Sequence, residues 1–327
     1  MVHAPVCASC NVSSSFNFRE ELVRFGYMLD RRLHVLRLVD ECGTVTAAAA
    51  ALYLTPSAVS QQIRALADTV GLELLEPHRR SVRLTPAGRA VLRHADRLHE
   101  YWELAQADLA GYGQEAVGVL RMAGFPTAVA ALVAPAAARL RRLTPGIQVE
   151  VSEADTADAF GLLLAEVVDI AVTVATPQMA AVGNHKFDQQ PLMDDPLDLL
   201  LPADHRLAGA GIASLHELAD EIWITPDPRQ SHHHDLVLHA CTAAGFRPHT
   251  VHRAKEWIGV AALVAHGFGV SLIPRLGFLL PPDYPVVRLP VRDAPTRQVL
   301  TCVRRGSREH PVVATGLNAL CTAAGTD

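Results

Sequence analysis

Residues 44–66 read TVTAAAAALYLTPSAVSQQIRAL, a pattern that predicts two short helices with a break between them. The alanine run at 47–51 predicts a narrow first helix, which Thr46 can cap because its hydroxyl can accept from a free N–H of the first turn. The break falls at 54–56, since the residue before a proline is biased away from helical angles, whereas Pro56 fits the first turn of the next helix. Three apolar residues at spacings of four and three predict the buried face of the second helix: Val59, Ile63 and Leu66.

The opposite face of this second helix carries hydroxyl, amide and guanidinium groups, which can hydrogen-bond base edges and phosphates in a major groove. The segment is therefore predicted to be a helix-turn-helix whose second helix reads DNA. The alternative is an ordinary helical hairpin with a polar outer face. The candidate DNA-binding residues of the segment are Thr44, Thr46, Thr55, Pro56, Ser57, Ser60, Gln61, Gln62 and Arg64.

The flanking segments extend this domain. Residues 30–41 predict a helix that ends before Gly43, and Gly71 ends the second helix of the pair. Residues 81–84 alternate as a strand does, so two extended arms around 77–80 predict a β-wing whose arginines can meet DNA phosphates. A solvated basic loop is the alternative. The wing candidates are Arg79, Arg80 and Arg83.

A long helix is predicted after the wing. Thr85 can cap it, and Pro86 fits its first position. Apolar residues then repeat at spacings that alternate between four and three, which is the pattern of a seam between two paired helices. A helix packed on its own domain is the alternative. The predicted dimerisation residues are Val91, Ala95, Leu98, Trp102, Ala105 and Leu109.

From Val117 onward the pattern changes to alternating strands and helices. Strands are predicted at 118–124, 147–151, 169–174, 197–201, 222–224 and 300–303. Helices are predicted at 127–143, 155–167, 215–218, 234–244, 259–266 and 312–323. Such alternation implies parallel sheet with crossover helices. Because two similar sets occur, we predict two α/β lobes around a cleft, with ligands bound at the carboxyl ends of strands.

These patterns divide the chain into four parts. Residues 1–27 are Ser-rich and lack periodicity, so they are predicted to be a disordered extension. The DNA-binding domain covers 28–85, the linker helix 86–112 and the two-lobed domain 117–327. Lobe I is predicted at 117–192 and 296–327, and lobe II at 193–295. The crossing segments at 191–195 and 293–296 are the predicted hinges.

Charge is distributed in a way that agrees with this division. The formal net charge of the whole chain is −5. Residues 29–97 carry ten arginines against seven acidic residues, a net of +3, and residues 1–28 cancel, so the remainder carries −8. A basic segment on an otherwise acidic chain suggests a local site for a polyanion.

Composition narrows the class of protein. With 327 residues, 50% of them hydrophobic, the chain can form two or three domains with sizeable cores. No run approaches about 18 apolar residues, so no membrane span is expected, and the opening residues do not have the pattern of a secretory signal. Six cysteines, mostly scattered, suit a reducing cytoplasm, which is the predicted location.

Residues 43–92 carry a specific motif, GTVTAAAAALYLTPSAVSQQIRALADTVGLELLEPHRRSVRLTPAGRAVL. With this motif, the chain from Met28 onward resembles the LysR-type transcriptional regulators, and GFGVSLIP at 267–274 resembles a strand that recurs in that family. One departure concerns the wing, where the family has Phe-x-Arg after Leu74 and this chain has Leu-Glu-Pro. The residues that stand where the family has them include the alanine pair, Ser60, Gln62, Ile63, Leu66, Gly71, Thr85, Pro86 and Gly88.

The resemblance implies an α/β protein with an N-terminal winged helix-turn-helix, a long dimerising linker helix and a C-terminal two-lobed effector domain similar to periplasmic binding proteins. It implies a dimer, or a tetramer built from dimers, that binds double-stranded operator DNA, with RNA polymerase as a candidate partner. It also implies that a small-molecule effector changes how the dimers hold DNA, without covalent chemistry. A paired seam predicts an inverted repeat in the operator.

The candidate effector residues lie at turns that the predicted topology brings to the cleft. The turn at 124–127 is attractive because a helix N-terminus offers free N–H groups to an anion, and Thr127 adds a hydroxyl. Arg229 can clamp a carboxylate. An ordinary loop position is the alternative for each residue. The candidates are Gly124, Phe125, Pro126, Thr127, Thr173, Thr176, Thr225, Arg229, His266 and Gly267.

Other function classes fit the sequence less well. The alternative is an enzyme or a solute-binding protein whose N-terminal helices serve only oligomerisation, but the chain contains no Gly-x-Ser-x-Gly elbow and no phosphate-binding glycine loop. Metal binding is disfavoured, since the adjacent histidines at 232–234 do not face one direction and the Cys7–Cys10 pair lacks a second pair. No cofactor is expected. Three cysteines of the α/β region are predicted to be small buried hydrophobes: Cys241, Cys302 and Cys321.

Overall fold

The structure is a computed structural model that describes residues 29–78, 81–112, 116–176, 185–227, 232–276 and 280–325. The chain forms two compact units, Met1–Ala95 and Asp96–Asp327, each of which is described by itself. The predicted extension at 1–27, with Cys7 and Cys10, lies outside the described residues.

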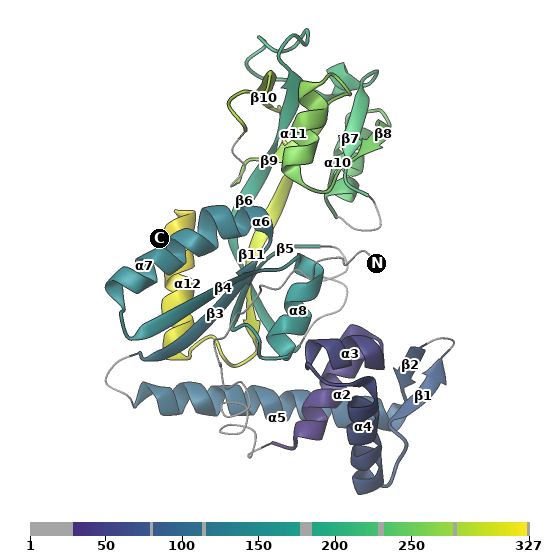
Figure 1. The fold of residues 1–327 in the computed structure, drawn as a ribbon, viewed down its shortest axis with the longest axis vertical. Helices are drawn as coiled ribbons and strands as arrows, with labels where there is room; N and C mark the ends of the chain where they lie inside the picture. The colour runs from purple at the N-terminus through teal and green to yellow at the C-terminus, as the bar shows by residue number, and fades with distance from the viewer. Residues whose placement is uncertain are drawn as a thin grey trace, which may run out of the picture. The chain divides into compact units, whose positions relative to one another are not determined.

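The first unit is a helix-turn-helix with a β-wing (Figure 1). Its elements are α2 (Arg31–Cys42), α3 (Val45–Ala51), α4 (Pro56–Val70), β1 (Leu75–His78), β2 (Ser81–Leu84) and the first part of α5 (Pro86–Gly111). The predicted inner face of α4 is confirmed, because Val59, Ile63 and Leu66 are all buried. Apolar side chains of α2 and α3 are buried with them, so three short helices share one small core.

Hydroxyl caps fix the starts of α3 and α4. The Thr44 hydroxyl accepts from the Ala47 N–H at 3.1 Å, so Thr44 caps α3. The prediction that Thr46 is the cap is wrong, because the helix begins before the alanine run and includes Thr46 in its first turn. The Thr55 hydroxyl caps α4 by accepting from the Ala58 N–H at 3.2 Å.

The predicted wing is confirmed as an antiparallel pair of strands, with Leu75 opposite Leu84 and His78 opposite Ser81. Gly88 connects the base of the wing to α5. A Cβ at this position would lie 2.1 Å from the carbonyl oxygen of Leu74, so only glycine allows the helix to pack this closely on the strand.

The second unit consists of the second part of α5 followed by an α/β domain (Figure 1). Its further helical elements are α6 (Pro126–Ala128), a π-helical turn (Val129–Val133), α7 (Ala134–Leu143), α8 (Thr156–Leu164), a 3-10 turn (Leu215–Leu218), α10 (His232–Ala243), α11 (Trp257–Ala265) and α12 (Pro311–Ala324). Its strands are β3 (Gly118–Gly124), β4 (Ile147–Glu153), β5 (Ile170–Val174), β6 (Phe187–Pro202), β7 (Ile222–Thr225), β8 (His249–Arg253), β9 (Ser271–Pro274), β10 (Val286–Pro290) and β11 (Thr296–Arg304).

Two long strands organise the α/β domain. The first half of β6 and most of β11 belong to lobe I, which contains β3, β4, β5, α6–α8 and α12. The second half of β6 pairs with β9 and β10 in lobe II, which also contains β7, β8, α10 and α11. The predicted parallel pairing is confirmed for β3 with β4 and β5 and for β7 with β8. The pairs of β11 with β5 and β6 are antiparallel, because β6 leaves lobe I while β11 returns to it.

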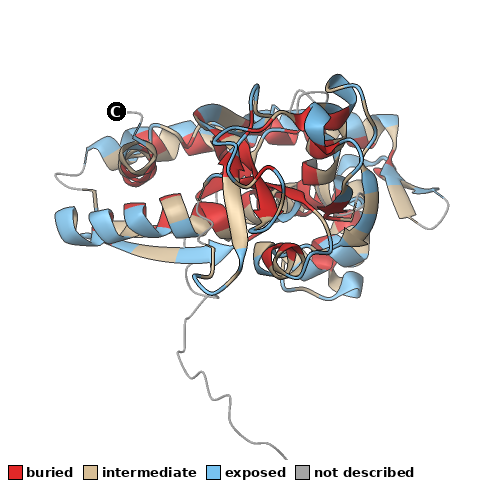
Figure 2. Ribbon diagram, turned by 90° about the horizontal axis from the view of Figure 1, so that it is seen from above, coloured by how far each residue is buried: buried red, intermediate tan, exposed pale blue. Residues whose placement is uncertain are grey.

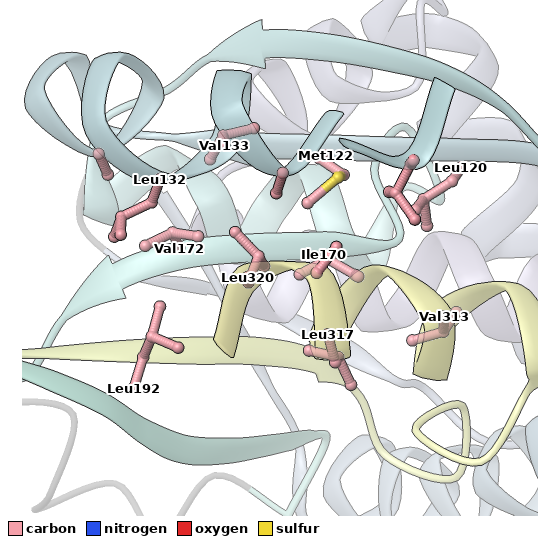
Figure 3. Packing of buried hydrophobic residues seen from close by; sticks show 14 of the residues in the cluster. Leu120, Met122, Leu132, Val133, Ile170, Val172, Leu192, Val313, Leu317 and Leu320 are labelled. Atoms are coloured by element: carbon pink, nitrogen blue, oxygen red, sulfur yellow. The ribbon is translucent and has the colours of Figure 1, made fainter. Parts of the chain in front are cut away.

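Each lobe has its own apolar core. The cluster in lobe I joins the strands to α12 and to the helix that follows β3, as Figure 3 shows. Its labelled members are Leu120, Met122, Leu132, Val133, Ile170, Val172, Leu192, Val313, Leu317 and Leu320. In lobe II the fully buried Trp223 lies in a cluster with α10 and β9 residues. Buried positions, red in Figure 2, accordingly gather on the strands and on the helix faces turned toward them.

Two strands, β8 and β10, have no counterpart in the sequence prediction, and β6 extends well beyond the predicted 197–201. β8 reads HTVHR and is half polar, so its composition does not mark it as a strand.

In the part of the chain that the structure describes, no helix is long and apolar enough to cross a membrane.

Candidate functional site

The outer face of α4 collects the polar side chains that are predicted to contact DNA bases. Ser57, Gln61 and Arg64 are exposed, and Ser60 and Gln62 are half-buried beside them. At the start of the helix Thr55 and Pro56 are exposed, and on the preceding helix Thr46 is exposed and Thr44 is half-buried. The structure therefore brings hydroxyl, amide and guanidinium groups together on one accessible side of the helix pair.

Arg32 at the start of α2 holds the other end of α4. Its Nη1 donates to the Ala65 carbonyl and to the Thr69 hydroxyl, each at 2.8 Å. Asp30, which caps α2, accepts from the same guanidinium at 2.5 Å and fixes its orientation. This role is not visible in the sequence, because the contacts join Arg32 to residues 33 and 37 positions away.

The wing is less positively charged than its sequence suggests. The Nε of Arg83 donates to the Glu76 carboxylate at 2.6 Å across the β1–β2 pair. Both side chains remain partly exposed, so this ion pair is weak and a phosphate can compete for the arginine. Arg79 and Arg80 lie outside the described residues.

The predicted dimerisation residues lie on the outer side of α5, with one exception. Leu98 and Leu109 are 48% and 65% exposed, and Val91, Trp102 and Ala105 are half-buried. Ala95 is only 3% exposed. It shares the buried side of the helix with Leu92 and His99, at spacings of three and four, so it is not available to a partner helix.

A buried polar cluster lies where the lobes join, beside the predicted anion site. Phe125 follows β3, and Thr127 stands in the first turn of the next helix with 5% exposure. The Nη2 of Arg297 donates to the Thr127 hydroxyl at 2.9 Å, and its Nε donates to Asp195 at 2.7 Å. The guanidinium also lies over the Phe125 ring, 4.8 Å from its centroid. Burial lowers the pKa of Arg297 and the Asp195 carboxylate opposes this effect.

Arg297 and Asp195 belong to the segments where β11 and β6 cross between the lobes. From the sequence these segments are predicted only as hinges, and neither residue is among the predicted members of the site. No local signal in the sequence points to Arg297, which stands between Thr296 and Gln298 at the polar start of β11. Asp195 is 1% exposed and also accepts from the Leu276 N–H at 2.8 Å, so the crossing is tied together by hydrogen bonds.

Two of the candidate threonines lie at the end of β5. Thr173 is fully buried, and among the described residues its hydroxyl has no hydrogen-bond partner. Its neighbour Val172 pairs with Gly124 on β3, so Thr173 lies next to the turn that carries Phe125. Thr176 is 6% exposed and follows the same strand. A buried hydroxyl without a partner is costly, which makes Thr173 a candidate to meet a bound molecule.

On the lobe II side, Thr225 ends β7 and is 1% exposed. Its hydroxyl lies 3.1 Å from Nδ1 of His234. The neighbouring His233 is buried, with Nε2 2.8 Å from the Leu272 carbonyl and its ring edge against Trp257. Burial lowers the pKa of His233 to about 4, so the ring is neutral at physiological pH. Both histidines therefore have partners within the protein; Arg229 lies outside the described residues.

The structure does not bring His266 and Gly267 to this site. They form the turn after α11, and β9 then runs back toward the crossing, reaching Leu197 of β6 only at Pro274. The opposite end of α11 faces lobe I, because Lys255 pairs with Asp155 at 3.0 Å. The strand that follows these two residues separates them from the crossing, and their role in effector binding stays a prediction.

These groups are suited to binding rather than to covalent chemistry. The start of the helix after β3 offers backbone N–H groups, and Arg297 and the threonines add donors. No group of three potential ligands for a metal occurs among the residues that the structure describes. Burial raises the pKa of Cys241 to about 12, so this thiol stays protonated, and Cys302 is also buried.

Comparison with family models gives two matches that together cover most of the chain. Residues 31–89 match the bacterial regulatory helix-turn-helix protein, lysR family. Residues 113–324 match the LysR substrate binding domain. The HTH-type transcriptional regulator ShiR of Corynebacterium glutamicum is 29% identical over 250 residues, which are 75% of this chain and 82% of that protein.

Solved structures share the same fold. A full-length OxyR variant from Pseudomonas aeruginosa superposes with a TM-score of 0.63 at 20% identity, over 90% of this chain and 95% of that one. Full-length CbnR in complex with its target DNA gives a TM-score of 0.52 at 21% identity, over 91% of this chain and all of that one (100%).

Proposed function

Because the chain belongs to the LysR family of DNA-binding transcriptional regulators, we propose that α4 and the wing read its operator and that a small molecule held between the lobes controls this binding. The observation that carries the proposal is the exposed polar face of α4, inside a segment that matches the family's helix-turn-helix. Under this proposal the chain acts by binding alone, without enzymatic activity, in the cytoplasm and with RNA polymerase as a candidate partner.

The test of this function is a gel-shift titration with labelled DNA fragments taken from beside the protein's own gene. A saturable shift of one fragment that survives unlabelled competitor DNA is expected. Footprinting of that fragment then locates the half-sites, which we expect as an inverted repeat about one helical turn apart or a multiple of that distance. Absence of a saturable shift on every fragment would contradict the proposal.

We assign base reading to the exposed polar face of α4 and phosphate contact to the wing. Gln61→Ala is expected to relax sequence preference at one operator position by about 1–3 kcal/mol, because a bidentate amide–base contact is lost. Affinity for each single-base variant of the operator measures this effect.

Arg80→Ala serves as the contrasting variant, since a phosphate contact carries no sequence information. It should weaken binding to all DNA similarly and reduce the slope of log affinity against log salt by about one. An unchanged salt slope would show that Arg80 does not contact a DNA phosphate.

Oligomerisation is assigned to the outer side of α5. The accessible members of the predicted seam are Val91, Leu98, Trp102, Ala105 and Leu109. An apolar stripe on a long helix is typical of helix pairing, and two such pairs can build a tetramer. Boundaries at 28–85, 86–112 and 117–327 are part of the same proposal, supported by family matches at 31–89 and 113–324.

The effector site is assigned to the region around Arg297. From lobe I it would take the turn Gly124–Thr127 with Thr173 and Thr176, and from lobe II Thr225 and Arg229. The paired Arg297 leaves the Thr127 hydroxyl oxygen accepting, so its hydrogen can donate to an acceptor group of the effector. Such a molecule would favour closed lobes over open lobes. It can shift this equilibrium only by the difference between its affinities for the two arrangements.

Thr127→Val is expected to retain basal operator binding and to weaken the response to effector by about 1–2 kcal/mol of coupling, because the variant keeps the shape but deletes the hydroxyl. The measurement compares operator affinity with and without effector in both proteins. Ser at this position, which restores the hydroxyl, is the rescue control. Loss of operator binding by Thr127→Val would make Thr127 a structural residue.

A further inference from the structure

The second part of α5 packs on lobe I through ionisable side chains. Asp96, His99 and Glu103 are 4%, 8% and 7% exposed. They recur at spacings of three and four, so they form one stripe along the helix. The apolar residues Leu98 and Leu109 lie on the other side and are largely exposed. Buried charges need partners of opposite sign, so this contact must be specific.

Arg304, the last residue of β11, supplies that partner. Its Nε donates to the Glu103 carboxylate. Its Nη1 donates to the carbonyls of Leu163 and Val168, at 3.3 and 2.8 Å, and its Nη2 donates to Asp169 at 3.2 Å. The acceptors come from α5, from the end of α8, and from the loop that leads to β5. One buried guanidinium therefore joins the helix to the main elements of lobe I.

Two further contacts hold the same face of α5. Gly306 has a φ of +94°, and a Cβ there would lie 2.5 Å from the Glu100 carbonyl oxygen, so the turn after β11 directly touches the backbone of the helix. Nearer the middle of α5, Asp96 lies 2.8 Å from Nε2 of His185, which precedes β6. The stripe is thus held along its length, with Arg304 as its most buried partner.

We propose that the Glu103–Arg304 ion pair is a coupling joint, which makes the second part of α5 and lobe I move as one body. α5 is one continuous helix from Pro86 to Gly111, so a displacement of lobe I would be transmitted along it to the base of the wing. A buried ion pair suits this purpose, because it favours a single registry over alternative packings. Arg304 is then a positioning residue that touches neither DNA nor effector.

The test is hydrogen exchange on the full chain, with Glu103→Gln against the wild type. If this ion pair holds α5 on lobe I, amides of residues 96–111 should exchange at least tenfold faster in the variant. Amides of β3, β5 and α12 should keep their wild-type rates. Asp108→Asn is the matched control, since it removes an exposed carboxylate from the same helix. Unchanged exchange at 96–111, or a uniform increase throughout the α/β domain, would overturn the proposal.

Arg304→Lys keeps the measurement decisive if Glu103→Gln does not fold. Lysine retains the charge but cannot bridge acceptors on three elements, so the same selective increase is expected.

Transmission along the helix is tested with the footprinted operator and a version with two base pairs inserted between its half-sites. The wild type should lose at least tenfold more affinity on insertion than the Glu103→Gln variant. Equal losses would overturn the coupling. Failure of the wild type to bind any operator contradicts the proposed function instead, and leaves the exchange test to decide on the joint.

Discussion

Leu98→Glu is expected to disperse the oligomer and to lower operator affinity by at least about 100-fold, about 2.7 kcal/mol. Leu98 is 48% exposed on the outer side of α5, where a paired helix would cover it. Burying a carboxylate in such a seam is unfavourable, and a single DNA-binding domain makes only half of the contacts that an inverted repeat offers. Analytical ultracentrifugation and gel-shift titration measure the two effects.

Leu104→Glu is the matched control for this experiment. It adds the same charge to a leucine that is 43% exposed on the same helix but lies outside the predicted seam. The oligomer and the operator affinity should both survive this change. An unchanged sedimentation coefficient for Leu98→Glu would show that the predicted seam on α5 does not hold the oligomer together.

Acid is expected to destabilise lobe II through His233, by about 3 kcal/mol of unfolding free energy between pH 6.5 and pH 4. Burial lowers the pKa of His233 from 6.5 to about 4 in the folded protein. In that interval the unfolded chain binds a proton that the folded chain does not, so stability falls as pH falls. Above pH 6.5 both states carry a neutral ring, and this histidine makes no pH-dependent contribution.

Chemical denaturation at a series of pH values tests this expectation. His233→Gln retains a side-chain donor near the Leu272 carbonyl and should flatten the loss between pH 6.5 and 5, whatever its effect on stability at neutral pH. His239→Gln, which removes an exposed histidine of the same helix, should keep the wild-type slope. Equal slopes for the two variants would mean that His233 does not carry the acid response.

The local sequence pattern is sufficient to predict the elements of the DNA-binding unit and most helices of the lobes. The inner face of α4, its proline start and the Thr85 cap all depend on residues within one or two turns, which the sequence displays directly. The cap of α3 was misplaced for the same reason, since two threonines stand two positions apart and both fit a cap. β8 was missed because half of its residues are polar.

The candidate site was predictable only in part, because its charged members meet across long stretches of chain. Thr127 stands out in sequence as a hydroxyl after a strand, whereas Arg297 lies 170 residues away and becomes relevant only once β11 is placed beside β6. Glu103 and Arg304 are separated by 201 residues. On a helix, Glu103 looks like a solvent-facing residue, and its burial follows only from the packing of α5 on lobe I.

The route of the chain through β6 and β11 also sets an order in which the protein can fold during synthesis. Lobe I begins at β3, but its sheet lacks β11, and its core lacks α12, until residues 296–324 leave the ribosome. The strands of lobe II are complete by Pro290, before either of these elements is made. Domains fold as their sequence emerges, so the inserted lobe should fold first and the lobe that encloses it should fold last. Nascent chains that end near residue 295 should therefore contain a protease-resistant lobe II beside a lobe I that is still open.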